Sequence, residues 1–315
     1  MSKGKRSISD RFLKQLKSNS DVQNVLLNTV RQDLDFCFEP REDHVTIYYR
    51  GKVMMEIKPH RKEPIECVFK GDARGDRDVS FQSNELSEEL IKTYREKIDS
   101  YLAETKEWPE AKYQFRIAHA NSINVSDDDC FLFVDSEYYQ RKKDKWRLDI
   151  VAINKKQGIL SLIEVKYGND SLRTRLPDKH GKNGNPGIRK HLEDFNIVKN
   201  SCDILQTMKN DFVKVIKQKE ALGLIGSMPD SLDFRLDKVE FLFVICNYDF
   251  SDNRNLKDEL NEIKANKELD RLSKENTFFC FPNYTESYRT EQEYKLNPKS
   301  FVDYESVMKK LASKG

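Results

Sequence analysis

The sequence has almost no excess charge of either sign and no long apolar run. Its 55 Lys and Arg residues stand against 53 Asp and Glu residues, so the net charge is only +2 in 315 residues. A basic field over the whole protein is therefore excluded, and a site for an anion such as nucleic acid must be a local patch. The longest apolar run, FLFVIC at 241–246, is far too short to cross a membrane. The N-terminal segment MSKGKRSISDRF lacks the apolar core of a signal peptide.

The sequence also lacks paired cysteines and several well-known catalytic motifs. Its cysteines are scattered, with no C-x-x-C pair, at positions 37, 67, 130, 202, 246 and 280. This spacing argues against a disulfide framework or a zinc knuckle and is typical of a protein of the reducing cytoplasm. The five histidines form no H-E-x-x-H motif, and the chain has no P-loop, Gly-rich dinucleotide turn or G-x-S-x-G elbow. We therefore expect a cytoplasmic protein outside these enzyme classes.

What is present is a mixture of helical and strand patterns, with enough apolar residues (37%) for a full core. Helices are expected at 8–33, 84–104, from 188 past 210, at 254–274 and near the C-terminus. Strands are expected at 44–59 (a hairpin), 112–119, 131–139, 147–154, 159–167 and 239–250. The charged loop at 69–80 suggests a boundary, which predicts an N-terminal α+β region at 1–83 and a second domain at 84–315.

The stretch RLDIVAINKKQGILSLIEVKYG, residues 147–168, is the most informative part of the chain. Two apolar runs flank the loop KKQG as in a β-hairpin. If the loop has four residues, Asn154 faces Ile159 and Asp149 lies directly opposite Glu164, about 5 Å away. Two ionised carboxylates at that distance repel each other by roughly 3 kcal/mol at an effective dielectric constant near 20. Such a pair is more suited to binding a divalent cation, Mg²⁺ or Mn²⁺, than to stabilising a hairpin.

Two further residues extend this candidate site. Lys166 lies on the same face as Glu164, one pleat along, where it can orient a water molecule or neutralise charge on a phosphate. If the segment RKKDK at 141–145 turns so that Gln140 faces Trp146, Glu137 falls opposite Asp149. Glu137 is then a third acidic candidate on a neighbouring strand.

A second Glu-x-Lys pair, in MEIK at 55–58, provides a comparison within the same chain. A tight turn at 50–52 sets Val45, Thr46 or Ile47 opposite Glu56, so no second carboxylate faces it. We interpret this pair as an ordinary strand with solvated charges.

Asp149 followed by Glu164-Val165-Lys166 on the next strand resembles the D…(D/E)-x-K signature of the PD-(D/E)XK nucleases. The order of helix, strands and helix around it, over roughly residues 84 to 250, also resembles the core of that superfamily. The resemblance implies an α/β fold with a restriction-endonuclease-like core, a mixed β-sheet flanked by helices. It also implies that Asp149, Glu164 and the backbone carbonyl of Val165 bind the metal and that Lys166 is the catalytic lysine. The signature differs in one place, because Leu148 rather than proline precedes Asp149.

The segment 171–191 is the most basic local stretch of the chain. It contains candidate phosphate contacts at Arg173, Arg175, Lys182, Arg189 and Lys190. A solvated loop explains the same composition equally well. Lys190 or His191, at the start of the following helix, can also reach the acidic site, although a surface role explains them as well.

Together these features predict a Mg²⁺- or Mn²⁺-dependent nuclease acting on DNA, with a role in defence or repair. The expected partner is nucleic acid and not a membrane, and both a monomer and a homo-oligomer are compatible with the sequence. Two alternatives remain open: a nucleic-acid-binding or assembly protein with the same fold but no catalysis, and an RNase. Retention of Asp149, Glu164 and Lys166 favours an enzyme over the first alternative.

Overall fold

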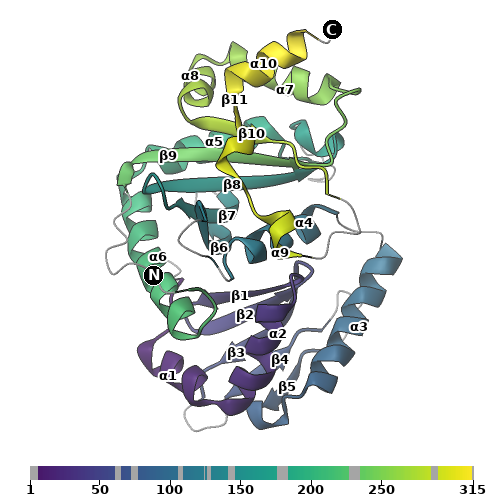
Figure 1. Ribbon diagram of the computed structural model, residues 1–315, viewed down its shortest axis with the longest axis vertical. Coiled ribbons are helices and arrows are strands. Elements are labelled where there is room, and N and C mark those ends of the chain that lie inside the picture. Colours follow the sequence, from purple (N-terminus) through teal and green to yellow (C-terminus); the bar gives the residue numbers. More distant parts are fainter. Residues whose placement is uncertain are drawn as a thin grey trace. The chain divides into compact units, whose positions relative to one another are not determined.

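The structure, a computed structural model, describes residues 6–60, 65–71, 77–105, 109–123, 125, 129–140, 146–175, 184–226, 235–284 and 290–313 (Figure 1). The architecture is α/β, and the chain divides into two compact units. The first unit comprises Met1–Asp129, Lys209–Leu232 and Arg289–Lys295, and the second comprises Cys130–Met208, Asp233–Tyr288 and Leu296–Gly315. No helix within the described ranges is both long and apolar enough to span a membrane.

The first unit is built on a sheet that, within the described residues, has five antiparallel strands in the order β1-β2-β3-β4-β5. The strands are β1 (Phe36–Arg41), β2 (His44–Tyr49), β3 (Lys52–Lys58), β4 (Glu66–Phe69) and β5 (Val79–Gln82). The helices are α1 (Asp10–Ser18), the π-helical η1 (Val22–Leu27), α2 (Asn28–Gln32), the short η2 (Ser83–Glu85), α3 (Glu88–Thr105), α4 (Pro109–Ala120) and α9 (Glu291–Tyr294). The helical region expected at 8–33 and the hairpin expected at 44–59 are confirmed.

Helix α3 belongs to the first unit because its apolar stripe packs against this sheet. Ile91 is buried, Leu90 and Ile98 pack against the same core, and the ring of Tyr94 stacks on that of Phe69 with 3.6 Å between centroids. The contacts therefore group residues 84–129 with the first sheet, whereas the sequence suggested a boundary between residues 83 and 84.

The strand predicted at 112–119 is wrong, because these residues form part of helix α4. Tyr113, Phe115 and Ile117 alternate as in a strand, but the intervening Gln114 and Arg116 are buried as well. A helix buried on several faces gives no clear period of 3.6 residues.

The second unit is built on a mixed sheet that, within the described residues, has six strands in the order β11-β10-β9-β8-β7-β6. The strands are β6 (Phe131–Gln140), β7 (Trp146–Asn154), β8 (Ile159–Tyr167), β9 (Arg235–Cys246), β10 (Thr277–Cys280) and β11 (Val302–Asp303). Strands β6, β7 and β8 are antiparallel neighbours, β9 is parallel to β8, and β10 is parallel to β9. The strands expected at 131–139, 147–154 and 159–167 are confirmed. The strand expected at 239–250 is also present, but it begins earlier, at Arg235, and ends at Cys246.

Helices connect and cover the parallel strands of this unit (Figure 1). They are the short η3 (Asp170–Leu172), α5 (Ile188–Lys199), α7 (Arg254–Ala265), α8 (Lys267–Asn276), the short η4 (Pro298–Ser300) and α10 (Tyr304–Ala312). The unit also contains the first residues of α6 (Cys202–Ala221), which from Lys209 onward belongs to the first unit. The two long helices expected after residue 188 and at 254–274 are each two helices, with breaks at Asn200-Ser201 and Asn266. Phe195 of α5 stacks on Phe241 of β9 at 4.6 Å between centroids, which fixes α5 against the sheet.

The six cysteines, all within the described residues, are free thiols. Cys37, Cys67, Cys246 and Cys280 are buried, Cys130 is half-buried and Cys202 is exposed at the start of α6.

Candidate active site

The hairpin of β7 and β8 has the register expected from a four-residue loop. Its pairs run from Asn154↔Ile159 to Ile150↔Ile163. Gly158, the last loop residue, has φ +61°, a left-handed conformation that glycine adopts without a steric penalty. Continuing this register by one residue sets Asp149 opposite Glu164, as the sequence predicts.

Asp149 and Glu164 lie together beyond the last backbone pair of the hairpin. Both residues are buried, with exposed fractions of 1% and 0%. The Val165 N–H donates to Asp149 Oδ2 at 3.1 Å, so a side chain, not the β7 backbone, takes this hydrogen bond. The N–H and C=O of one strand residue point to the same edge, so the Val165 carbonyl also faces the β7 edge of β8.

Two cationic or potentially cationic groups contact Glu164. Lys166 Nζ lies 2.8 Å from Glu164 Oε1, and His191 Nε2 lies 2.9 Å from the same oxygen. Lys166 comes from the same face of β8, while His191 comes from the first turn of α5. Both side chains are buried. Of the two residues suggested at the start of this helix, His191 reaches the acidic pair, whereas Lys190 forms an ion pair with Asp194.

Glu137 joins the site through an arginine. The β6–β7 pairs Ser136↔Ile150 and Tyr138↔Leu148 flank Glu137 and Asp149, which agrees with the expected register. Arg147 Nη1 lies 3.3 Å from Glu137 Oε2, and Arg147 Nη2 lies 3.6 Å from Asp149 Oδ1. The Arg147 side chain is 57% exposed, so it forms the outer layer of the site.

Burial and like charge both disfavour ionisation of the acidic pair. Burial raises the pKa of Asp149 to about 7, and the charge of Glu164 adds to this effect, while Lys166 and Arg147 oppose it. Burial also raises the pKa of Glu164 above its ordinary value, and Lys166 again opposes the shift. A perturbed pair of carboxyl groups beside a lysine is a frequent feature of functional sites.

The donor atoms fit a hard divalent cation. Two carboxylates and one backbone carbonyl from adjacent strands are oxygen ligands of the kind that Mg²⁺ and Mn²⁺ prefer, and Mg²⁺ usually retains several water ligands. In the part of the chain that is described, no group of three His, Cys, Asp or Glu side chains is arranged to hold a metal ion. The oxygen donors present at this point of the sheet are the carboxylates of Asp149 and Glu164 and the carbonyl of Val165.

The hairpin of β2 and β3 shows what the same Glu-x-Lys spacing does on a strand with solvent access. Glu56 faces Thr46, one of the three partners expected. Glu56 and Lys58 form an ion pair at 3.2 Å with side-chain exposures of 21% and 41%, against 1% and 4% for Glu164 and Lys166. Lys70 Nζ lies 3.7 Å from Glu56 as well.

Most of the basic residues expected to contact nucleic acid are paired with carboxylates. Arg173 contacts Asp258 at 2.8 Å, and Arg189 contacts Glu193 at 3.1 Å and Glu262 at 3.2 Å. Arg175 is exposed, and its backbone pairs with Asn185. Lys182 lies outside the described residues. The charge that this surface offers to a phosphate backbone is therefore smaller than its composition suggests.

Glu259 is a positioning residue with no signal in the sequence. This buried side chain of α7 accepts hydrogen bonds from the Thr174 N–H at 2.9 Å and from the Arg189 N–H at 2.8 Å. A carboxylate at a helix N-terminus is stabilised by the helix dipole. Glu259 therefore anchors the first turn of α5, which contains His191.

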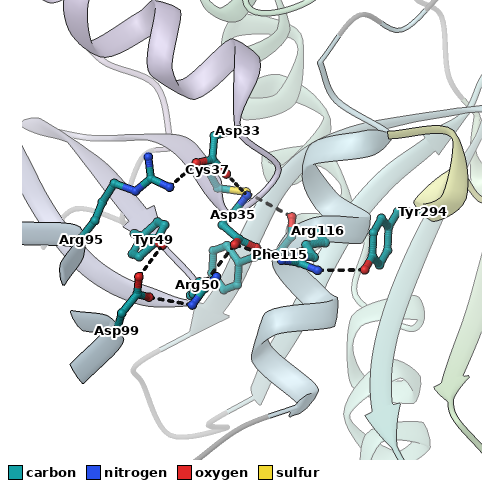
Figure 2. A network of polar contacts seen from close by, with 10 residues as sticks. All are labelled: Asp33, Asp35, Cys37, Tyr49, Arg50, Arg95, Asp99, Phe115, Arg116 and Tyr294. Atoms are coloured by element: carbon teal, nitrogen blue, oxygen red, sulfur yellow. Dashed lines mark hydrogen bonds and ion pairs between the residues drawn. The ribbon is translucent and has the colours of Figure 1, made fainter. Parts of the chain in front are cut away.

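A second buried polar cluster lies in the first unit (Figure 2). Asp35 accepts from Arg116 Nη2 at 3.0 Å and from Arg50 Nε at 2.9 Å, and Arg50 continues to Asp99 at 2.7 Å. Arg95 pairs with Asp33 at 2.8 Å. The arginines of this cluster are each held by a carboxylate, so we interpret it as an ion network that joins α3, α4 and the ends of β1 and β2.

Comparison of the chain with protein-family models, with curated proteins and with solved structures gave no match.

Proposed function

We propose that the chain is a metal-dependent nuclease that hydrolyses phosphodiester bonds, with DNA as its substrate. The observation that supports this function best is the buried pair Asp149 and Glu164, held on adjacent strands with Lys166 on the same face as Glu164. A fold gains no stability from two neighbouring buried carboxyl groups, so their burial is better explained by chemistry than by packing.

In this proposal Asp149, Glu164 and the Val165 carbonyl hold Mg²⁺ or Mn²⁺. A metal bound there lowers the pKa of a coordinated water and stabilises charge on the phosphate. His191 holds Glu164 in place from α5, and the Val165 N–H holds Asp149. These two contacts keep the carboxylates oriented before the substrate arrives.

Lys166 and Arg147 have separate roles. Lys166 Nζ forms an ion pair with Glu164 Oε1 in the free protein. During hydrolysis it donates a hydrogen bond to the attacking water or to a phosphate oxygen. Arg147 is the most exposed of the cations around the acidic pair and meets the incoming phosphate first. A guanidinium suits this role because its paired donors match phosphate oxygens.

The order of elements around the site also supports the proposal. Three antiparallel strands, β6 to β8, are followed by helices and by β9 parallel to β8. This order is similar to that of the PD-(D/E)XK core.

The test is a cleavage assay on plasmid, linear duplex, single-stranded DNA and RNA, each with Mg²⁺, Mn²⁺ or EDTA. We expect cleavage of DNA with metal and none with EDTA. Asp149→Ala, Glu164→Ala and Lys166→Ala should each lower the rate by about a hundredfold or more. The matched control variants Glu56→Ala and Lys58→Ala, from the solvated hairpin, should keep the wild-type rate.

Three results contradict the proposal in distinct ways. Equal losses in both hairpins would place the site elsewhere. Cleavage of RNA alone would identify an RNase. Binding of nucleic acid without metal-dependent cleavage would identify a binding or assembly protein.

A further inference from the structure

Helix α7 meets the basic segment before and at the start of α5 with three carboxylates. They are Asp258, Glu259 and Glu262, which lie within about one turn of the helix and project from the same side of it. Each of them contacts Arg173, Thr174 or Arg189, and all of these residues belong to the second unit. The three carboxylates differ in burial, and this difference separates their roles.

Glu259 is the fixed member of the three. Its side chain is fully buried and accepts hydrogen bonds from the backbone N–H groups of Thr174 and Arg189. A ligand that displaced this carboxylate would leave those backbone donors without an acceptor, which is costly. Glu259 therefore holds the segment in place and is not available for exchange.

Asp258 and Glu262 form ion pairs at the surface instead. Asp258 Oδ2 lies 2.8 Å from Arg173 Nη1, with side-chain exposures of 48% and 40%. Glu262 Oε2 lies 3.2 Å from Arg189 Nε, but within the described residues this Nε atom makes no hydrogen bond. Solvent screens such pairs and their ordered side chains lose freedom, so they contribute little to stability. Another anion can therefore replace either carboxylate at small cost.

Both arginines lie close in the chain to the proposed active site. Arg189 and His191 share the first turn of α5, and His191 Nε2 lies 2.9 Å from Glu164 Oε1. Arg173 directly follows the short η3, which comes soon after Lys166 at the end of β8. In a nucleic acid with one phosphate at Glu164, the neighbouring phosphates are the anions best placed to reach Arg173 and Arg189.

We propose that Asp258 and Glu262 are exchangeable counterions that limit the affinity of the chain for nucleic acid. In the free protein they occupy Arg173 and Arg189, and on binding two phosphates take their places while the carboxylates turn to solvent. A guanidinium suits this exchange because its paired N–H donors match carboxylate and phosphate alike. Each bound phosphate also releases condensed counterions, which favours the nucleic acid over the carboxylate. The inference rests on the proposed function for its ligand, duplex DNA.

The experiment measures binding of a short fluorescein-labelled duplex to the full chain in EDTA, by anisotropy at several salt concentrations. Asp258→Asn and Glu262→Gln keep the shape of each side chain and remove its charge. Each should raise the affinity by about two- to fivefold, the range that an exposed ion pair allows. The double variant should gain on the order of tenfold, since the two pairs do not share a residue. These gains should shrink as the salt concentration rises.

A double-mutant cycle separates exchange from repulsion at a distance. In a chain that carries Arg173→Ala, Asp258→Asn should give no gain, because no guanidinium remains to be released. Glu262→Gln is tested against Arg189→Ala in the same way. An equal gain with and without the arginine would show that the carboxylate merely repels DNA, and would overturn the proposal.

The other end of α5 provides a matched control. Glu275 of α8 pairs with Lys199, the last residue of α5, at 3.7 Å, with side-chain exposures of 55% and 27%. Glu275→Gln removes the same charge from the same kind of pair between two helices, away from His191, and should bind duplex as wild type. If it gains as much affinity as Asp258→Asn, only the net charge matters and the proposal is wrong.

Folding and cleavage are measured separately. The single variants should melt within about 4 °C of wild type, since each loses only an exposed ion pair. A chain that shows the expected gains in affinity but cleaves nothing would contradict the nuclease proposal alone. A chain that cleaves DNA, but binds it equally well with and without the two carboxylates, would contradict the present inference alone. Failure of both wild type and the double variant to bind duplex would also overturn it.

Discussion

The carboxyl group of Asp149 ionises with difficulty because it is buried and because Glu164 lies beside it. Its pKa of about 7 in the folded chain is well above the ordinary value of 3.8. Between about pH 4 and pH 7 the folded chain therefore binds more protons than the unfolded chain, and the free energy of unfolding falls as the pH rises. In EDTA, the free energy of unfolding of wild type should therefore fall by on the order of 2–4 kcal/mol more than that of Asp149→Asn as the pH rises through this range.

A bound cation should reverse this order. At a hundred times its dissociation constant, Mg²⁺ or Mn²⁺ adds about 2.7 kcal/mol to the stability of wild type. Asp149→Asn and Glu164→Gln should lose most of that gain, although in EDTA above neutral pH they melt at or above wild type. Thermal melts of the three proteins, with metal and with EDTA, measure both effects. A wild type that is indifferent to metal would contradict this prediction.

Asp35 has the opposite electrostatic environment. Burial alone would raise its pKa, but hydrogen bonds and charges from Arg116 and Arg50 outweigh burial and lower it. Its contribution to stability is therefore present above the ordinary pKa and is lost as the pH falls through the lowered value. Asp35→Ala leaves the Arg116 charge buried and should cost about 3–5 kcal/mol in urea unfolding at neutral pH.

Asp99 is the matched control for Asp35. It pairs with the same Arg50 but is 39% exposed, so Asp99→Ala should cost no more than about 1 kcal/mol. If the two variants lose equal stability, the buried network of Figure 2 has less importance than its geometry suggests.

At the scale of elements, the placement of α5 depends on one close backbone approach. A Cβ atom at Gly187, the N-cap of α5, would collide with backbone atoms of Leu172, Arg173 and Thr174. Gly187→Ala should therefore destabilise by about 1–3 kcal/mol and displace the first turn of α5. Because that turn holds His191 against Glu164, cleavage should fall as well, measured at a temperature at which the variant is folded.

Gly223→Ala provides the comparison for Gly187→Ala. Gly223 has φ +65°, so alanine there is strained by roughly 1–2 kcal/mol, but it lies in the first unit and contacts no site residue. It should lose stability and keep its cleavage rate. Loss of cleavage in both variants would mean that stability alone, and not the placement of α5, explains the effect.

The sequence allowed the hairpins to be predicted closely and the helices less so. A four-residue loop sets a single register for β7 and β8, and successive side chains of a strand point to opposite faces of the sheet. The positions of Asp149, Glu164 and Lys166 could therefore be counted from the loop. Helix α4 was missed even though it begins at a proline, a common first residue of helices, because its buried faces hide the helical period. Contacts such as those of Glu259 join elements distant in sequence and leave no local pattern.

At the scale of the whole molecule, each unit consists of segments that are not continuous in sequence. A fragment of residues 84–315 would retain α3 without the sheet that covers Leu90, Ile91 and Tyr94. A fragment of residues 130–315 would retain Leu222 and Leu224 without the rest of the core to which they belong. We expect both fragments to bind a hydrophobic dye strongly and to aggregate in size-exclusion chromatography, whereas the full chain does neither. A monomeric fragment with dispersed amide resonances would contradict this expectation.

The unequal burial of the six thiols makes this protein suitable for selective labelling. Burial raises the pKa of Cys67 to about 12, and it raises the pKa of Cys37 and Cys280 as well. A thiol reacts as its thiolate and only where a reagent can reach it. Cys202 is exposed, so a maleimide at neutral pH should attach there first, and more slowly at the half-buried Cys130. The native chain thus accepts a fluorophore or an immobilisation tag at the start of α6 with no cysteine replaced.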